Sequence, residues 1–390
     1  MKYITFIFLF LVAFYISGCQ QAEDPNPHQS IHTDDGFEHA SFIEAGMDSS
    51  YLLRMASAID SGVYPNIHSV LIAKNGKLVF EKYFRGQDEI LGNSIGVVSH
   101  HQDSLHDIRS VTKSIVSACV GLALAEGKIE SVNQSVWDFF PEYKNLATGE
   151  KSKLTVKHLL TMTSGFEWNE NIPYTDPTNS EIQMDQSPDP IQFVLSRKLV
   201  QPPGQSWNYN GGTTQLLAAI IKKSTGQEID EYAEKNLFAP LGVSRHVWLK
   251  FSDSSLLKDV PLAAAGLRLR STDLLKFGLL YMNKGMWNGK RILPEKWIEE
   301  SLSSHIRLDP VSGQDGYGYQ FWIFRDSVDH TPVTLAASVG NGDQRIFMDW
   351  DNDLLIVTTA GNYNQWMIKN NVAAVLKNFI YPSLTTVGKK

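Results

Sequence analysis

Residues 110–126 have the sequence SVTKSIVSACVGLALAE, a long and almost uncharged stretch that is followed by Gly127. Its length and its small apolar residues predict one buried helix that begins at Ser110, a residue type common at helix starts. Ser110 and Lys113 then lie one turn apart on the same face of this helix. A serine hydroxyl becomes a good nucleophile when a base accepts its proton, and a desolvated lysine with a lowered pKa can be that base. The start of a helix also directs backbone NH groups and the positive end of the helix dipole toward an oxyanion.

Two other serine motifs compete with Ser110 for this chemistry. The segment GNSIG at 92–96, centred on Ser94, is a formal G-x-S-x-G. The residues after it show no helical periodicity, so we expect a surface loop instead of the strand-to-helix turn of an α/β-hydrolase. Ser255 and Lys258 form a second S-x-x-K in a short Ser/Asp-rich segment, where such a two-position pattern arises readily by chance. The motif at Ser110 opens a buried helix, although the four residues alone also fit a plain helix cap.

Strand-like segments at both ends of the chain flank a helical middle. Residues 67–73 and 78–84 surround Asn75-Gly76, which predicts a hairpin with a type I′ turn. Helices are expected at 110–126, 156–161, 190–199, 213–224, 229–237, 272–282 and near 366–379, and further strands at 317–324, 333–337, 344–348 and 354–359. We expect the two sets of strands to pair into one antiparallel sheet. The helical middle would then pack partly as a second lobe, with reactive groups in the cleft between the lobes.

The composition is that of a globular protein of one or two domains. The chain has 390 residues, of which 43% are hydrophobic and 20% charged. There are 35 Lys and Arg against 42 Asp and Glu, giving a net charge of -7. This balance, without a basic run, argues against nucleic acid as a partner.

Three histidines, His100, His101 and His106, lie close together in one polar segment. Three imidazoles could bind a metal ion, but no cysteine or clustered acid completes a recognisable pattern and no HExxH occurs. We therefore expect a solvated loop there, and no metal or cofactor.

The first apolar stretch predicts where the protein resides. Lys2 is followed by an uncharged run from Ile4 to Ile16 and then by Ser17-Gly18-Cys19. This resembles a bacterial lipoprotein signal with its lipobox, and the run is short for a membrane span. We expect a signal peptide over 1–18, a lipid on Cys19 that anchors the mature chain to a membrane of the bacterial cell envelope, and a polar tether over 19–40. An uncleaved anchor is the alternative.

The second cysteine is the only thiol left if Cys19 is acylated, so the mature chain can form no intramolecular disulfide. Cys119 lies in the small-residue apolar run of the predicted helix. No charged neighbour in the sequence would lower its pKa, so we expect a buried structural thiol.

Further motifs occur in an order that resembles a known family. They are RSVTKS at 109–114, HLLTMTSG at 158–165, PGQSWNYNGG at 203–212, AAGLRLRSTDL at 264–274 and AASVGNG at 336–342. Together, over about residues 65–375, they resemble the serine β-lactamase and penicillin-recognising family. Within it they are most similar to class C β-lactamase-like esterases and amidases, including nylon-oligomer hydrolases.

The resemblance implies a β-lactamase/transpeptidase-like α/β (α+β) fold, in which an antiparallel sheet is flanked by helices and joined to an all-helical lobe. We expect a single catalytic domain over 41–385. Its sheet lobe would comprise about 41–135 and 265–385, and its helical lobe about 136–264.

The resemblance also assigns roles to individual residues. Ser110 matches the acylating serine, Lys113 the lysine of S-x-x-K, and Tyr209 the tyrosine of a Y-x-N motif. A tyrosine has a reference pKa of about 10, so the Lys113 ammonium would help Tyr209 to ionise, and the proton is best treated as shared among the three. By position, the backbone NH groups of Ser110 and Asn341 would form the oxyanion hole.

Two departures from the family pattern bear on the substrate. The first is Gly211, which stands where the Y-x-N motif has an asparagine; the adjacent Asn210 could substitute for the missing amide. The second is the sequence S-V-G from Ser338 to Gly340, where β-lactamases have K-T-G. Asn210, Gly211, Ser338 and Gly340 are the expected substrate-binding residues. Because the cation for a substrate carboxylate is absent, the favoured activity is hydrolysis of a small ester, amide or peptide through a Ser110 acyl-enzyme. The alternatives are a β-lactamase or D-alanyl-D-alanine carboxypeptidase, or a catalytically silent lipoprotein that binds peptidoglycan or a partner.

Overall fold

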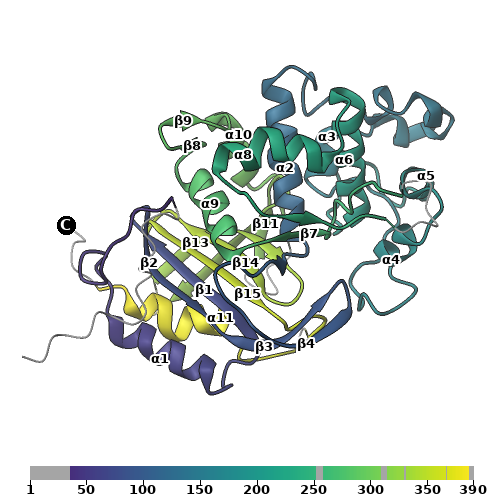
Figure 1. Ribbon diagram of the computed structural model, residues 1–390. Coiled ribbons are helices and arrows are strands. Elements are labelled where there is room, and N and C mark those ends of the chain that lie inside the picture. Colours follow the sequence, from purple (N-terminus) through teal and green to yellow (C-terminus); the bar gives the residue numbers. More distant parts are fainter. Residues whose placement is uncertain (1–35, 252–257, 309–313, 329–330, 366, 386–390) are drawn as a thin grey trace, which may run out of the picture.

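The computed structural model describes residues 36–251, 258–308, 314–328, 331–365 and 367–385 (Figure 1). The signal peptide, Cys19 and most of the tether fall outside these residues, as does Ser255 of the second S-x-x-K motif. Among the described helices, none combines the length and the apolar character that crossing a membrane requires.

One antiparallel sheet joins the two ends of the chain, as expected. Within the described residues it has eight strands in the order β10-β11-β12-β13-β14-β15-β1-β2. Their bounds are β1 (Ile67–Lys74), β2 (Lys77–Tyr83), β10 (Ile306–Arg307), β11 (Gln314–Tyr317), β12 (Trp322–Val328), β13 (Thr331–Gly340), β14 (Gln344–Asp349) and β15 (Leu354–Ala360). β1 pairs with β15, with Lys74 opposite Leu354. The hairpin turn has positive φ at Asn75 (54°) and Gly76 (77°), which confirms the predicted turn.

Helices cover both faces of this sheet (Figure 1). α1 (Ser49–Asp60), α11 (Val372–Val375), η6 (Leu376–Ile380) and η7 (Tyr381–Ser383) pack on one face, whereas α2 (Val111–Ala125), α9 (Ser271–Met282) and α10 (Glu295–Leu302) pack on the other. The strand residues alternate between these two cores: Val70 and Ile72 point into the first, and Leu71 and Ala73 into the second.

The regular elements between Val136 and Leu241 are all helical, and α6, α7 and η4 pack against α2. They are η1 (Val136–Asp138), η2 (Pro141–Leu146), η3 (Gly149–Lys153), α3 (Val156–Leu160), α4 (Ser180–Asp185), α5 (Pro190–Ser196), α6 (Gly211–Thr225), α7 (Ile229–Ala233), η4 (Glu234–Phe238) and α8 (Ala239–Leu241). α2 therefore lies between the sheet and this helical region, with nearly all its side chains buried. Cys119 is buried there as predicted, and burial raises the pKa of its thiol.

The predicted strand at 317–324 is in fact interrupted. β11 ends at Tyr317 and β12 begins at Trp322, because Gln320 turns inward with φ of 66° and donates to the carbonyls of Leu159 and Leu160. The predicted final helix is also shorter than expected. It begins at Val372, where the side chain of Asn371 caps it.

The segment before the nucleophile is a hairpin and not the predicted loop. β3 (Arg85–Ile90) pairs with β4 (Asn93–Ser99), and Ser94 is exposed on this hairpin, away from any strand-to-helix turn. β5 (His106–Asp107) then pairs with β7 (Leu267–Leu269), which pairs with β6 (Val247–Trp248). A last small hairpin comprises β8 (Met286–Trp287) and β9 (Lys290–Arg291).

Candidate active site

Ser110 stands at the N-terminal cap of α2, where the prediction places it. The preceding residue, Arg109, has φ of 49°, a left-handed conformation that turns the chain sharply from β5 into the helix. Lys113 Nζ donates to Ser110 Oγ at 3.0 Å and to the Ala264 carbonyl at 2.9 Å. Both side chains are buried, with Lys113 only 1% exposed. The predicted contact within the S-x-x-K motif is confirmed.

Tyr209 completes the predicted group of three. Its side chain interacts with those of Ser110 and Lys113, and Lys113 Nζ lies 5.0 Å from the centre of its ring. Trp322 stacks on Tyr209 at 5.7 Å between ring centres, and Trp207 lies 6.2 Å away. The aromatic packing fixes the phenol beside the serine. The structure thus brings the three residues together, while their roles in catalysis remain predictions.

Two buried glutamates, which the sequence analysis missed, also face Lys113. Its Nζ is 3.6 Å from Glu181 Oε2 and 4.0 Å from Glu170 Oε1. Glu170 accepts three hydrogen bonds, from Trp168 Nε1 at 2.7 Å, Tyr174 Oη at 2.8 Å and the Gly211 backbone NH at 2.7 Å. These donors satisfy the hydrogen-bonding capacity of the buried Glu170 side chain.

The charges in this group differ from the prediction of a lysine with a lowered pKa. Burial alone would lower the pKa of Lys113, but Glu181, Tyr209 and Glu170 together hold it above its ordinary value. Burial raises the pKa of Tyr209 despite the opposing effect of Lys113. Burial and the adjacent Glu170 raise the pKa of Glu181 well above its usual range. These pKa directions favour an ammonium at Lys113 and the protonated forms of Tyr209 and Glu181, which agrees with the expected Lys113 ammonium and differs from a lysine with a lowered pKa.

Glu181 explains why the family amide is missing at Gly211. A Cβ at Gly211 would collide with Glu181 Oε2 and would lie 3.2 Å from Ala264 Cβ. A side chain at position 211 would require Glu181 to move, because its carboxyl group fills the space next to the backbone. The adjacent Asn210 does not replace the amide, since its Oδ1 accepts from the Thr213 NH at 3.1 Å and caps α6.

A cavity of about 250 Å³ opens beside Ser110. Its lining residues are Glu89, Leu91, Gly92, Arg109, Ser110, Tyr174, Thr175, Glu181, Ile182, Asp185, Gln215, Leu262, Ala264, Ala265, Asn341 and Asn364. Ser110 and Asn341, the two predicted oxyanion residues, thus both line this cavity. Among the described residues, this lining includes none of the four predicted substrate-binding residues.

The S-V-G segment, Ser338 to Gly340, is not among the described residues that line the cavity. Ser338 is 1% exposed, and a Cβ at Gly340 would collide with the Ile108 carbonyl, so glycine permits β13 to approach the chain before α2. A cation that the sequence analysis missed lies nearby on β14. Arg345 donates to the Gly340 carbonyl at 2.6 Å and pairs with Asp343 at 3.1 Å, so its guanidinium is already engaged.

The sheet, the helical region and the S-x-x-K helix between them define the β-lactamase/transpeptidase-like class of serine hydrolases. The Beta-lactamase family model matches residues 62–373, and the chain therefore belongs to the β-lactamase family.

Relatives in this family include hydrolases of esters and of amides. The chain is 24% identical to the 6-aminohexanoate-dimer hydrolase of Paenarthrobacter ureafaciens, over 65% of this chain and 66% of the relative. It is also 24% identical to esterase EstB of Burkholderia gladioli, over 44% of each chain. The D-amino acid amidase of Ochrobactrum anthropi shares the fold, with a TM-score of 0.62, 15% identity, and coverage of 85% of this chain and 98% of the amidase. The chain spans between 33% and 70% of the curated relatives' lengths.

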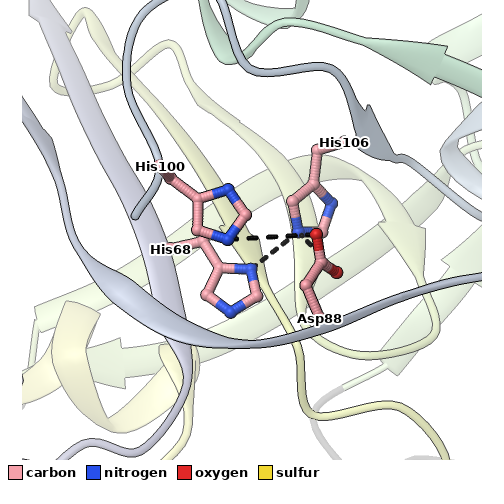
Figure 2. A group of neighbouring side chains, drawn as sticks. All are labelled: His68, Asp88, His100 and His106. Carbon is pink, nitrogen blue, oxygen red and sulfur yellow. Dashed lines mark hydrogen bonds and ion pairs between the residues drawn. The ribbon is translucent and has the colours of Figure 1, made fainter. Parts of the chain in front are cut away.

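The expectation of a solvated histidine loop is wrong for two of its three members. His100 and His106 are buried, and they lie against His68 and Asp88 (Figure 2). Only His101 is exposed. The sequence analysis missed this cluster because His68 and Asp88 come from β1 and β3, far from the other two along the chain.

Proposed function

We propose that this protein hydrolyses ester or amide bonds of a small substrate through an acyl-enzyme on Ser110. The observation that carries the proposal is the 3.0 Å hydrogen bond from Lys113 Nζ to Ser110 Oγ at the wall of a cavity, with Tyr209 beside both. Membership of a hydrolase family with esterases and amide hydrolases supports it.

The proposed reaction uses the groups of the site in two stages. Ser110 Oγ forms a bond to the substrate carbonyl carbon, and its proton passes to the Lys113–Tyr209 pair, which must first be one proton short. The backbone NH groups of Ser110 and Asn341 would stabilise the oxyanion. The bond to the leaving group then breaks, and the pair returns the proton to the departing alcohol or amine. Water then gives a proton to the same pair and attacks the ester carbonyl carbon; the bond to Ser110 Oγ breaks, the pair returns that proton to Ser110 Oγ, and the acid is released.

The charges around the cavity favour a substrate without a carboxylate at this position. Glu181 and Asp185 both line the cavity. Burial and the neighbouring Glu170 raise the pKa of Asp185 to about 7, so this group is partly ionised near neutral pH. Arg109 also lines the cavity, but it is 2.5 Å from Glu89, so its charge is compensated. A β-lactamase or D-alanyl-D-alanine carboxypeptidase, whose substrates carry a carboxylate, is therefore disfavoured.

The direct test is the Ser110→Ala variant, assayed with a short-chain p-nitrophenyl ester. We expect the substitution to abolish turnover, whereas the matched Ser94→Ala variant, altered on the exposed β3–β4 hairpin, should remain active. Loss of activity in the Ser94 variant alone would instead support the α/β-hydrolase alternative.

We also propose that Cys19 carries a lipid that anchors the protein at the bacterial cell envelope. The support is Ile16-Ser17-Gly18-Cys19 and the polar segment after it, all of which lie outside the described residues. Cys19→Ala should release the protein from membranes or stall its processing, whereas Cys119→Ala, at the buried cysteine, should leave it membrane-bound. A Cys19→Ala protein that still takes up labelled palmitate would show that the lipobox assignment is mistaken.

A further inference from the structure

Four metal-ligating side chains converge at one buried point outside the proposed active site (Figure 2). His68 lies on β1, Asp88 on β3, His106 on β5, and His100 directly follows β4. One potential ligand atom from each lies within 4.8 Å of all the others. The four residues are between 0% and 9% exposed. Ordinary core packing does not require three imidazoles and a carboxylate to meet in this way.

The hydrogen bonds around the cluster orient its side chains toward a common centre. His106 Nδ1 lies 3.1 Å from the Asp107 carbonyl, so Nδ1 carries the proton and Nε2 presents its lone pair to the cluster. Asp88 Oδ1 accepts from Tyr363 Oη at 3.1 Å and from the Glu89 NH at 2.8 Å. Such outer contacts are those that orient metal ligands in proteins.

His100 provides the second, independent observation. Its side chain is 3% exposed, and its Nε2 makes no hydrogen bond to any residue in the described part of the chain. The nearest charged atom is Asp88 Oδ2, at 3.9 Å. Leaving a buried polar atom without a partner is unfavourable, and a bound cation would satisfy it.

We propose that His68, Asp88, His100 and His106 form a binding site for a single divalent transition-metal ion, and that zinc is the ion its chemistry suits best. Three imidazole nitrogens and one carboxylate oxygen match the ligand types of zinc, and four protein ligands are typical of a structural site. Calcium and magnesium are disfavoured because they prefer oxygen ligands.

Binding requires a small rearrangement of one pair of ligands. His68 Nδ1 and His106 Nε2 are 2.8 Å apart, joined by one proton. Two nitrogens on a tetrahedral zinc ion would lie about 3.3 Å apart, so the rings must separate slightly. The bridging proton must also leave His68 Nδ1; if it moves to Nε2 of the same ring, that imidazole stays neutral.

The ion would connect parts of the chain that the sheet does not join. The β3–β4 hairpin pairs only with itself within the described strands. Its residues Glu89, Leu91 and Gly92 line the cavity, and Ser110 follows His106 by four positions. A bound ion would hold this cavity wall against the strand that leads to the proposed nucleophile.

The test is metal binding by the full-length, tag-free protein after treatment with a chelator. Titration with Zn²⁺ alone should show one bound ion per chain, raise the melting temperature and slow hydrogen exchange in residues 85–107. Co²⁺ alone should give the visible spectrum of a tetrahedral site. His100→Ala and Asp88→Asn should weaken zinc binding at least about tenfold. His101→Ala, altered at the exposed neighbour, should bind like the wild type.

The proposal is overturned if the wild-type protein takes up no stoichiometric zinc, or if His100→Ala binds it as tightly as the wild type does. Equal loss in His101→Ala would also contradict it. If His100→Ala fails to fold, zinc binding is measured on His100→Gln instead, after its circular dichroism spectrum has shown that this variant is folded. These readouts do not depend on activity, so they stand apart from the proposed hydrolase function.

Discussion

Among the individual residues, Lys113 shows most clearly how neighbours determine the chemistry available at the site. Its ammonium lies within 4.0 Å of both Glu181 and Glu170, and these acids outweigh the effect of burial on its pKa. Tyr209, which could act as the base, is also held protonated by burial. Lys113 and Tyr209 are therefore both favoured in their protonated forms. The form of this pair that has lost one proton, and can accept one from Ser110, is the less populated form at neutral pH.

The first prediction concerns the pH dependence of activity. Because the pKa values of Lys113 and Tyr209 are both raised, the form with one proton fewer increases as the pH rises. On the acid side, kcat/KM for a p-nitrophenyl ester should therefore increase by up to about tenfold per pH unit through neutrality and reach its plateau only at alkaline pH. The measurement is kcat/KM corrected for spontaneous hydrolysis. A plateau already reached below pH of about 6 would show that the base has a lowered pKa.

The second prediction concerns Tyr209. Tyr209→Phe keeps the ring that stacks on Trp322 but removes the hydroxyl that meets Ser110 and Lys113. We expect kcat to fall by about 100-fold or more, as for loss of a general acid or base, with little change in the melting temperature. Turnover near that of the wild type would remove Tyr209 from the mechanism.

At the scale of elements, the packing of α4 against the start of α6 determines which residue can follow Asn210. Glu181 on α4 occupies the space that a side chain at Gly211 would need. The residues at positions 181 and 211 are therefore coupled by packing.

The third prediction tests this coupling. Gly211→Ala should destabilise the protein by about 1–3 kcal/mol through overpacking, and Glu181→Ala in the same chain should recover part of that loss. The measurement is a double-mutant cycle of unfolding free energies in denaturant. Gly212→Ala is the matched control, because its Cβ would meet Trp168 and Val194 at 2.7 Å, so Glu181→Ala should not rescue it. Additive effects at Gly211 and Glu181 would contradict the coupling.

Local patterns in the sequence predict most of the elements and part of the site. The α2 helix, the Asn75-Gly76 turn and the contact of Ser110 with Lys113 depend on spacing along the chain, so they could be predicted. Glu170 and Glu181 reach Lys113 only through tertiary packing, from segments without a periodic pattern. His68 and His106 likewise meet across 38 positions of the chain. Long-range contacts of this kind determine the charges of the site and leave no local signal.

At the scale of the whole molecule, one cavity is lined by residues from two parts of the chain. Asn341 follows a strand of the sheet, whereas Tyr174 and Glu181 belong to the helical region. The acids Glu181 and Asp185 line it, and its Arg109 is paired with Glu89. The other nearby guanidinium, Arg345, is held by the Gly340 carbonyl and Asp343. Among the described residues that line the cavity, the Arg109 guanidinium is thus already paired, so the arrangement is suited to a substrate without a carboxylate.

The fourth prediction follows from this charge distribution. Recognition of a β-lactam lacks the cation at Ser338 for its carboxylate and the amide at Gly211 for its side chain, and each lost hydrogen bond should cost about 1–3 kcal/mol. In one preparation, kcat/KM for a p-nitrophenyl acyl ester should exceed that for nitrocefin by at least about 100-fold. Efficient nitrocefin turnover would restore the β-lactamase assignment.

The central claim is that Ser110 is the single acylated nucleophile, and fluorophosphonate labelling tests it most directly. Intact-mass analysis of the labelled protein, followed by peptide mapping, should show one adduct located on Ser110. The adduct should be absent from Ser110→Ala and unchanged in Ser94→Ala. A label mapped to Ser94 or another serine, or an active protein that takes up no label, would contradict the account.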